Sequence, residues 1–435
     1  MSITASSGTW TIGDNWPWPR MFIISHYVLA VVIEESNLTL FELVNDSNQW
    51  TATKMQVLGT LSSIESVSIA DFDQYYVITV FGYSGSILTT MMYARNPNAA
   101  SGTSAMSTIS SGTIPHGTAI CSHLGQMIIG GLKSTDAKWS ELGTCAVAYG
   151  GIMNMEFNPY IDPSAGFLKM PWDIENQGKI YSLLSLHNDV IVYGDRGIER
   201  LTPFNSNEIT GYGQRTIWPY GILGFNCAAG TDDIHCFIDS NYDLCLLPKE
   251  SDIKVLGYRP FMKTLVRDKI ILSYEPKRRH FYISDGLLCY ILTESGMYTT
   301  HQCVSGVGTY GSISCGFIKD NTDTKIRFVT TEFDLTYQNN KAIEEVEFGV
   351  NYNTEADHLL TGCIYTKYDY SSDFTKLPWI GLNNKGILNQ KCAGRTFKIG
   401  LESNYESGAE FSFDSLYARV SFDDKHNVTW RLKDK

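Results

Sequence analysis

The chain has 435 residues, of which 43% are hydrophobic, 12% aromatic and 18% charged, with 37 glycines and 13 prolines. This composition excludes a largely disordered chain, and many aromatic residues and glycines with few charges favour strands and tight turns over helices. The formal net charge of −12 argues against a broad basic surface that would grip a phosphate backbone.

The first twenty residues are predicted to form an extended arm. They contain Trp10, Trp16 and Trp18, with prolines at positions 17 and 19. Exposed aromatic side chains on an arm need a groove, either on the chain's own body or on a neighbouring subunit, so these three tryptophans are the predicted interaction residues. The segment lacks the basic and apolar regions of a secretory signal, and no apolar run reaches the length of a membrane span. We therefore expect a protein made in a cytoplasm.

Six pairs of short apolar runs follow, each pair separated by a turn rich in Gly, Asp, Asn or Ser. Such pairs predict β-hairpins. The hairpins cover residues 26–44, 75–93, 126–149, 189–202, 234–247 and 280–292.

The spacing of these hairpins predicts a β-propeller. Successive hairpins, measured at Ile33, Val80, Ile129, Tyr193, Ile238 and Ile283, lie 47, 49, 64, 45 and 45 residues apart. A period near 45–50 residues suits four-stranded blades. The long interval is assigned to an insertion over residues 154–178. The sequence thus predicts a propeller of about six blades over residues 21–323, with an irregular series of β-sandwiches as the alternative.

The hydrophobic pattern of the sequence changes near residue 324. Polar and apolar residues alternate over long stretches, at 325–337, 342–352, 395–401 and 411–422. Alternation with period two is typical of strands with one wet face and one core face. A C-terminal β-sandwich domain is therefore predicted over residues 324–435.

Motifs for catalysis, cofactors and metals are not found. Gly306, Gly308 and Gly311 match a dinucleotide-binding pattern by letter, but a strand-like run follows them where the cofactor's pyrophosphate needs a helix N-terminus. Asp232, Asp233, His235 and Cys236 form the densest run of ligand residue types, yet on one strand they would point to both faces. The ten cysteines are isolated and sit in apolar runs, as buried reduced thiols do. The sequence predicts no enzyme, no cofactor and no metal site.

One hairpin carries a family resemblance. Residues 183–203, LLSLHNDVIVYGDRGIERLTP, resemble blade segments of the tail hub, nozzle and packaged-DNA-stabilisation proteins of short-tailed bacteriophages. The predicted propeller-plus-sandwich layout and the chain length are also similar to that group. The resemblance implies a structural virion protein of the tail, with host cytoplasm as its location during assembly.

Further expectations follow from this resemblance. Several copies, six by expectation, would close a ring that contacts the portal and adaptor and docks a tail fibre or plug. DNA would pass through the channel without specific binding, since an acidic wall repels phosphates. The alternatives are a receptor- or glycan-binding propeller and a propeller-fold hydrolase.

Overall fold

The computed structural model divides the chain into two compact units, Met1–Lys319 and Asp320–Lys435; the sequence-based division was placed at 323/324. The structure describes residues 4–5, 8–9, 16–24, 27–46, 49–73, 75–84, 87–96, 105–109, 114–132, 142–173, 178–206, 209–300, 302–310, 313–320, 326–330, 332–334, 340–352, 360–368, 373–383, 385–403, 411–422 and 427–432.

The first unit is a β-propeller. Its described part contains six four-stranded antiparallel sheets, here called blades 1 to 6, each formed by strands in chain order. Blade 1 comprises β3 (Arg20–Ile24), β4 (Tyr27–Glu34), β5 (Asn37–Asp46) and β6 (Gln49–Thr60); blade 2 comprises β7 (Ile64–Phe72), β8 (Tyr75–Ser84), β9 (Ile87–Arg95) and β10 (Met106–Thr108); blade 3 comprises β11 (Ala119–His123), β12 (Gln126–Gly130), β13 (Ala146–Tyr149) and β14 (Gly166–Lys169).

The second half of the propeller repeats this plan. Blade 4 comprises β15 (Ile180–Leu186), β16 (Asp189–Gly194), β17 (Ile198–Ser206) and β18 (Ile209–Trp218); blade 5 comprises β19 (Ala228–Thr231), β20 (Ile234–Ile238), β21 (Leu244–Pro248) and β22 (Lys254–Val255); blade 6 comprises β23 (Ile271–Glu275), β24 (His280–Ser284), β25 (Cys289–Thr293) and β26 (Gly296–Thr300). Short helices are η1 (Leu61–Ser63), α2 (Arg259–Met262) and η2 (Arg267–Lys269), and a small sheet pairs β1 (Thr4–Ala5) with β2 (Gly8–Thr9). None of the helices in the described part has the length and apolar character needed to cross a membrane.

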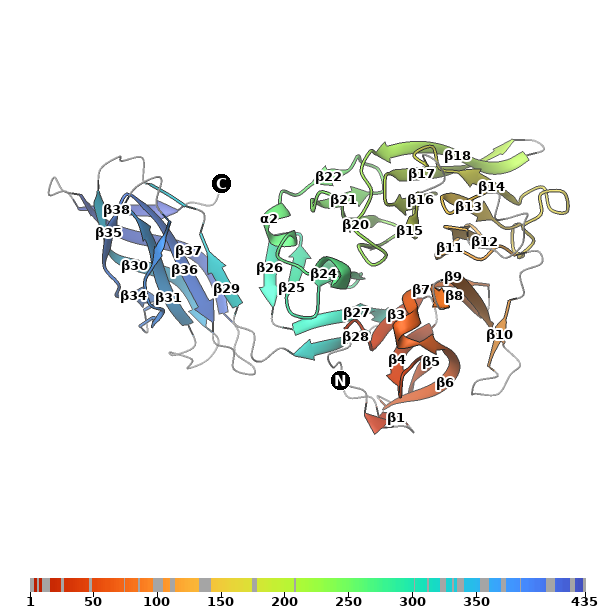
Figure 1. The fold of residues 1–435 in the computed structure, drawn as a ribbon, viewed down its shortest axis with the longest axis horizontal. Coiled ribbons are helices and arrows are strands. Elements are labelled where there is room, and N and C mark those ends of the chain that lie inside the picture. Colours follow the sequence, from red (N-terminus) through yellow and green to blue (C-terminus); the bar gives the residue numbers. More distant parts are fainter. Residues whose placement is uncertain are drawn as a thin grey trace. The chain divides into compact units, whose positions relative to one another are not determined.

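A two-stranded sheet closes the ring between the last and first blades. It consists of β27 (Gln302–Tyr310) and β28 (Ile313–Asp320). Strand β27 contacts β23 of blade 6 on one side and β3 of blade 1 on the other. Figure 1 shows the blades following one another around the ring in chain order. The prediction of a β-propeller is confirmed, and six full blades are accompanied by a seventh, two-stranded member that the sequence analysis did not identify.

The predicted hairpins correspond to the second and third strands of the blades. These strands are covered on both faces by neighbouring blades, so their residues are buried without alternation, as in β12 and β16. A continuous apolar run is therefore the signature of a blade interior. Residues 154–178, predicted to be an insertion, contain the fourth strand of blade 3, β14.

The second unit is a β-sandwich. One five-stranded sheet contains β29 (Ile326–Val329), β36 (Thr396–Ser403), β31 (Leu360–Lys367), β32 (Thr375–Lys376) and β33 (Ile380–Gly381). The other contains β34 (Ile387–Leu388), β30 (Lys341–Tyr352), β37 (Phe411–Phe422) and β38 (Asn427–Leu432), with β35 (Cys392–Gly394) paired to β30. Side chains from both sheets share one apolar core, which includes Phe348, Ile364 and Phe397. Alternation along these strands gives each sheet its core face.

Candidate functional site

The histidine of the predicted ligand run lies in the interior of the propeller. His235 is buried; its Nε2 lies 2.8 Å from the carbonyl oxygen of Ser185, and its Nδ1 lies 2.9 Å from the hydroxyl of Tyr193. A carbonyl can only accept, so Nε2 donates and Nδ1 accepts from the tyrosine. Burial lowers the pKa of His235 to about 4. This imidazole is a neutral structural group that joins blades 4 and 5.

The rest of the dense ligand run is dispersed. Asp233 lies at the surface and pairs with Lys249 at 2.9 Å, while Cys236 is buried in the blade core. In the described residues no group of three His, Cys, Asp or Glu side chains converges on a point that could hold a metal ion. The cysteines are unpaired and nine are buried, which raises the thiol pKa, for Cys227 to about 12. These thiols act as small apolar residues, as predicted.

The glycine pattern near residue 306 has a packing role. Gly306 and Gly308 lie in β27, and a Cβ on Gly306 would be 2.2 Å from the backbone oxygen of Met21 in β3. A Cβ on Gly308 would be 2.8 Å from the side chain of Ile23. Small residues here allow the closing strand to approach blade 1. In the part of the chain that the structure describes, the strand β28 follows β27.

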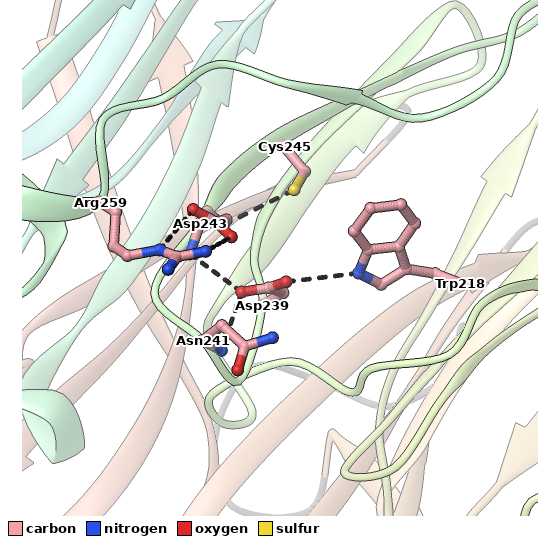
Figure 2. Close-up of polar contacts among 6 residues, drawn as sticks. All are labelled: Trp218, Asp239, Asn241, Asp243, Cys245 and Arg259. Atoms are coloured by element: carbon pink, nitrogen blue, oxygen red, sulfur yellow. Dashed lines mark hydrogen bonds and ion pairs between the residues drawn. The ribbon is translucent and has the colours of Figure 1, made fainter.

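Aspartates stabilise the hairpins between the second and third strands of blades 4, 5 and 6. Asp239 and Asp285 accept backbone N–H groups of their own hairpins through Oδ1, whereas Asp195 Oδ1 accepts from the N–H of Lys179 and so attaches the hairpin of blade 4 to the segment before β15. Figure 2 shows the blade 5 example, where Asp239 Oδ1 accepts from the backbone N–H groups of Asn241 and Asp243, both at 2.9 Å. The indole of Trp218 donates to Oδ2 at 3.4 Å. Asp239 is fully buried, and both of its oxygens accept hydrogen bonds, one from the turn and one from Trp218, so we assign it to folding rather than chemistry.

The next carboxylate in this turn is also paired. Asp243 accepts from Nε and Nη2 of Arg259 in α2, a two-point ion pair. Proximity to Asp243 raises the pKa of the Arg259 guanidinium. The ion pair attaches the connection between blades 5 and 6 to the hairpin of blade 5.

A groove opens between blades 5 and 6 at the other end of their strands. It has a volume of about 440 Å³ and is lined by Asp233, Ile234, Leu246, Lys249, Tyr274, Arg279, Phe281, Leu292, Thr293 and Glu294. The rings of Tyr274 and Phe281 stack with centroids 4.3 Å apart. The ion pairs Asp233–Lys249 and Arg279–Glu294, at 2.9 and 3.1 Å, stand on its rim. An apolar wall with paired charges at the rim suits a small ligand or a peptide side chain.

The loop between β13 and β14 is fixed by its own polar groups. Asp162 accepts from the backbone N–H of Ser164 and from the side-chain amide of Asn154, both at 2.8 Å. These hydrogen bonds lower the pKa of Asp162. The buried amide of Gln126 donates to the carbonyl oxygens of Gly150 and Ser164, at 2.7 and 2.9 Å, near both ends of the loop. The backbone conformation of the loop is thus specified from within and from blade 3.

This fixed loop turns its apolar side chains outward. Tyr160 is 95% exposed, Ile161 66% and Met153 62%. The neighbouring β11–β12 turn adds Leu124, and the two segments meet where the backbone N–H of Met153 donates to the oxygen of Gly125. We call Leu124, Ile152, Met153, Tyr160 and Ile161 the blade 3 surface. Exposed apolar groups held in one geometry are typical of an interface.

The predicted interaction residues lie elsewhere. Trp16 packs with Ile271 and Cys289 of blade 6, and its indole donates to the carbonyl oxygen of Lys269 at 2.8 Å. Trp18 is buried in the core shared by blades 1 and 2. Both side chains therefore occupy the chain's own body, between strands rather than on an outer wall. Trp10 lies outside the described residues. Residues 16–20 belong to the propeller, not to an arm, because Trp16 and Trp18 are buried in its cores and β3 starts at Arg20.

Sequence reasoning missed the blade 3 surface. The segment was recognised as a loop from its prolines and glycines, but the direction of its apolar side chains was not predicted. One available signal is the density of Asn, Asp and Ser among apolar residues at 150–165, since these side chains bond their own backbone and fix loops.

Comparisons with known proteins yield remote structural likeness only. No protein-family model and no curated protein matches the sequence. BamB from Moraxella catarrhalis aligns over 69% of this chain and 91% of its own, with 9% identity and a TM-score of 0.34. A protein from Lactobacillus plantarum aligns over 64% and 81%, with 12% identity and a TM-score of 0.37. Hsv2 from Kluyveromyces lactis aligns over 65% and 84%, with 6% identity and a TM-score of 0.34. Likeness at this level assigns no function.

Proposed function

We propose that this protein is a non-catalytic structural subunit that works by binding other protein subunits, in the tail of a short-tailed bacteriophage. The observation that carries the assembly part is the blade 3 surface. A single copy gains nothing from exposing a tyrosine, two isoleucines and a methionine on a loop with a hydrogen-bonded backbone, and a leucine on the turn beside it. Pre-organised apolar side chains reduce the entropy lost on association.

The assignment to a phage tail depends on the resemblance of residues 183–203. In the fold these residues run from β15 through β17 and form the interior of blade 4. On this proposal the protein forms a hub, nozzle or stabilisation ring that extends the DNA channel, contacts the portal and adaptor, and docks a fibre or plug. It is made in the host cytoplasm and resides in the virion. The net charge of −12 suits a channel that DNA slides through.

The test combines a mass measurement in solution with negative-stain imaging. We expect closed rings, or oligomers that share one repeated contact, with more than about 1,000 Å² buried per interface. A monomer at micromolar concentration, or single copies located on fibres in a virion map, would contradict the proposal.

The groove between blades 5 and 6 supports a second candidate, a receptor- or glycan-binding propeller. Its aromatic wall and rim charges offer both stacking and hydrogen bonds to a small ligand. A screen of glycans and short peptides is the direct test, with Arg279→Ala and Tyr274→Ala as variants. Binding that both variants weaken would favour this candidate. Binding insensitive to both would exclude the groove.

A further inference from the structure

A second exposed apolar surface lies in the connection between blades 5 and 6. Phe261 of α2, Val266 and Leu287 are exposed. Asp285 links two of them, since its Oδ2 accepts from the backbone N–H of Val266 and its Oδ1 from that of Leu287, both at 2.9 Å. The ring of Phe261 lies 5.9 Å from that of Tyr290 in blade 6. The backbone at Val266 and Leu287 is therefore fixed by one carboxylate, and Phe261 packs on the same blade through Tyr290.

This surface is basic in an acidic protein. Between residues 259 and 269 there are four bases, Arg259, Lys263, Arg267 and Lys269, and one acid, Asp268, a formal balance of +3 in a chain of −12. All four basic residues are exposed, but Arg259 is paired with Asp243, and Asp285 accepts from the backbone of Val266 and Leu287; with these two buried acids the formal balance is +1. We call Phe261, Val266 and Leu287, with these bases, the blade 5–6 surface. Its apolar centre with a charged rim is the usual anatomy of an interface.

The blade 3 surface has the opposite charge. Residues 150–165 contain two acids, Glu156 and Asp162, and no base. The two surfaces also lie at opposite ends of the strands. In an antiparallel meander the turns between strands one and two, and three and four, lie at one end; the second turn and the connection to the next blade lie at the other. Leu124 and the β13–β14 loop belong to the first end, whereas Leu287 and α2 belong to the second.

We propose that copies of this chain bind head to tail, the blade 3 surface of one copy packing on the blade 5–6 surface of the next. Different patches on opposite ends of one subunit generate a heterologous contact, which closes a ring when the rotation per subunit permits. Opposite charges set the orientation and disfavour contact between two like surfaces. This inference deepens the proposed function and rests on its claim of self-assembly.

The apolar content favours a protein partner over nucleic acid. A phosphate backbone would use the four bases but offers nothing to Phe261, Val266 and Leu287, whereas the blade 3 surface supplies both acids and apolar side chains. Binding of a DNA duplex to the four bases is therefore the alternative that the experiment must distinguish.

The experiment uses two full-length variants that each lose one surface. One carries Met153→Ser with Tyr160→Ser, and the other carries Lys263→Glu with Leu287→Ser. These four side chains are exposed, so circular dichroism and thermal unfolding should match the wild type. The matched control carries Val44→Ser with Tyr298→Ser, two exposed residues of blades 1 and 6. The two variants receive different fluorophores, and sedimentation velocity measures association at low and physiological salt.

We expect each variant alone to associate about tenfold or more weakly than the wild type, and the control to be unchanged. An equimolar mixture should restore one strong contact, between the intact blade 5–6 surface of the first variant and the intact blade 3 surface of the second, giving two-colour dimers that grow no further. Higher salt should weaken this dimer.

Other results separate the failure of this inference from that of the proposed function. A wild-type protein that stays monomeric contradicts both. If the wild type forms oligomers and either variant forms the same oligomers, the head-to-tail contact alone is overturned. The same holds if the mixture yields no two-colour dimer. A 20-base-pair DNA duplex tests the other partner. If the duplex binds the wild type with a steep salt dependence and fails to bind only the variant with Lys263→Glu, the basic surface binds nucleic acid, and the head-to-tail contact is overturned.

Discussion

The hairpin of blade 5 and the β13–β14 loop of blade 3 are stabilised by the same kind of hydrogen bond, but the first holds a side chain in the core and the second holds side chains in solvent. In each, an aspartate bonds to its own backbone: Asp239 to the N–H groups of Asn241 and Asp243, and Asp162 to that of Ser164. The hairpin holds Asp239 inside the propeller, whereas the loop holds Tyr160 in water. In the hairpin the fixed backbone therefore stabilises the fold, whereas in the loop it holds apolar side chains exposed to solvent. The following variants test that distinction.

Truncating Trp16 should have the largest effect on stability, because this ring fills the hairpin side of blade 6. A Cβ on Gly286 would lie 2.7 Å from the indole, which shows how closely the two segments approach. We expect Trp16→Ala to lower the free energy of unfolding by about 3–5 kcal/mol. Denaturant unfolding measures the change. Trp16→Phe, which keeps a ring but loses the bond to Lys269, should cost about 1 kcal/mol. Equal stability of Trp16→Ala and wild type would mean that residues 16–19 do not belong to the fold.

Acid should destabilise the contact between blades 4 and 5 through His235. Its pKa in the folded state is about 4, below its ordinary value of 6.5, so the unfolded chain takes up the proton first as the pH falls. The stability contribution is complete above pH 6.5 and decreases down to about pH 4, by roughly 3 kcal/mol. His235→Gln, which cannot titrate, should show a smaller decrease over that range in urea unfolding. Parallel pH profiles for the two proteins would show that His235 is not the group responsible.

Removing the hairpin carboxylate should have an intermediate effect. Asp239→Ala removes the acceptor of two backbone N–H groups, that of the exposed Asn241 and that of the buried Asp243, and we expect a loss of about 2 kcal/mol. Asp239→Asn keeps an acceptor oxygen and should lose less. Thermal unfolding of the two variants makes the comparison, and a neutral Asp239→Ala would contradict the structural role assigned to this turn.

The sequence predicted the strands whose residues are all buried, but it did not predict the strands whose burial depends on which other strands lie beside them. The run Val190 to Tyr193 is buried on both faces, so it identified β16 directly. The outer strand β22 has two exposed residues, Lys254 and Val255, and carries no such signal. The seventh, two-stranded member was missed because Gly306 and Gly308 weaken the strand pattern, although their small size is what allows β27 to pack on blade 1.

The two candidate surfaces were beyond sequence reasoning for a related reason. Apolar residues are usually buried, so a tyrosine or phenylalanine in a connecting segment does not by itself predict an exposed side chain. The exposure of Tyr160 and Phe261 follows from loops whose polar side chains are satisfied locally, which requires coordinates to recognise. The three tryptophans were predicted to occupy a groove on the chain's own body or on a neighbouring subunit, and Trp16 and Trp18 fill space between strands of the chain's own propeller that are distant in sequence.

The smallest change in stability is expected from Asp162→Ala. It removes the acceptor for Ser164 and Asn154, as Asp239→Ala removes that of the hairpin, but the freed donors of this surface loop can reach water. The free energy of unfolding should therefore fall by less than about 1 kcal/mol. Association should nevertheless weaken, because Tyr160 and Ile161 would no longer be held in one orientation and binding would have to order them. Urea unfolding and sedimentation velocity on the same preparation measure the two quantities, with Asp162→Asn, which retains one acceptor oxygen, as the matched control. Association equal to that of the wild type would show that the rigidity of the loop does not contribute to binding. A loss of stability as large as that of Asp239→Ala would show that the loop is part of the fold rather than of an interface.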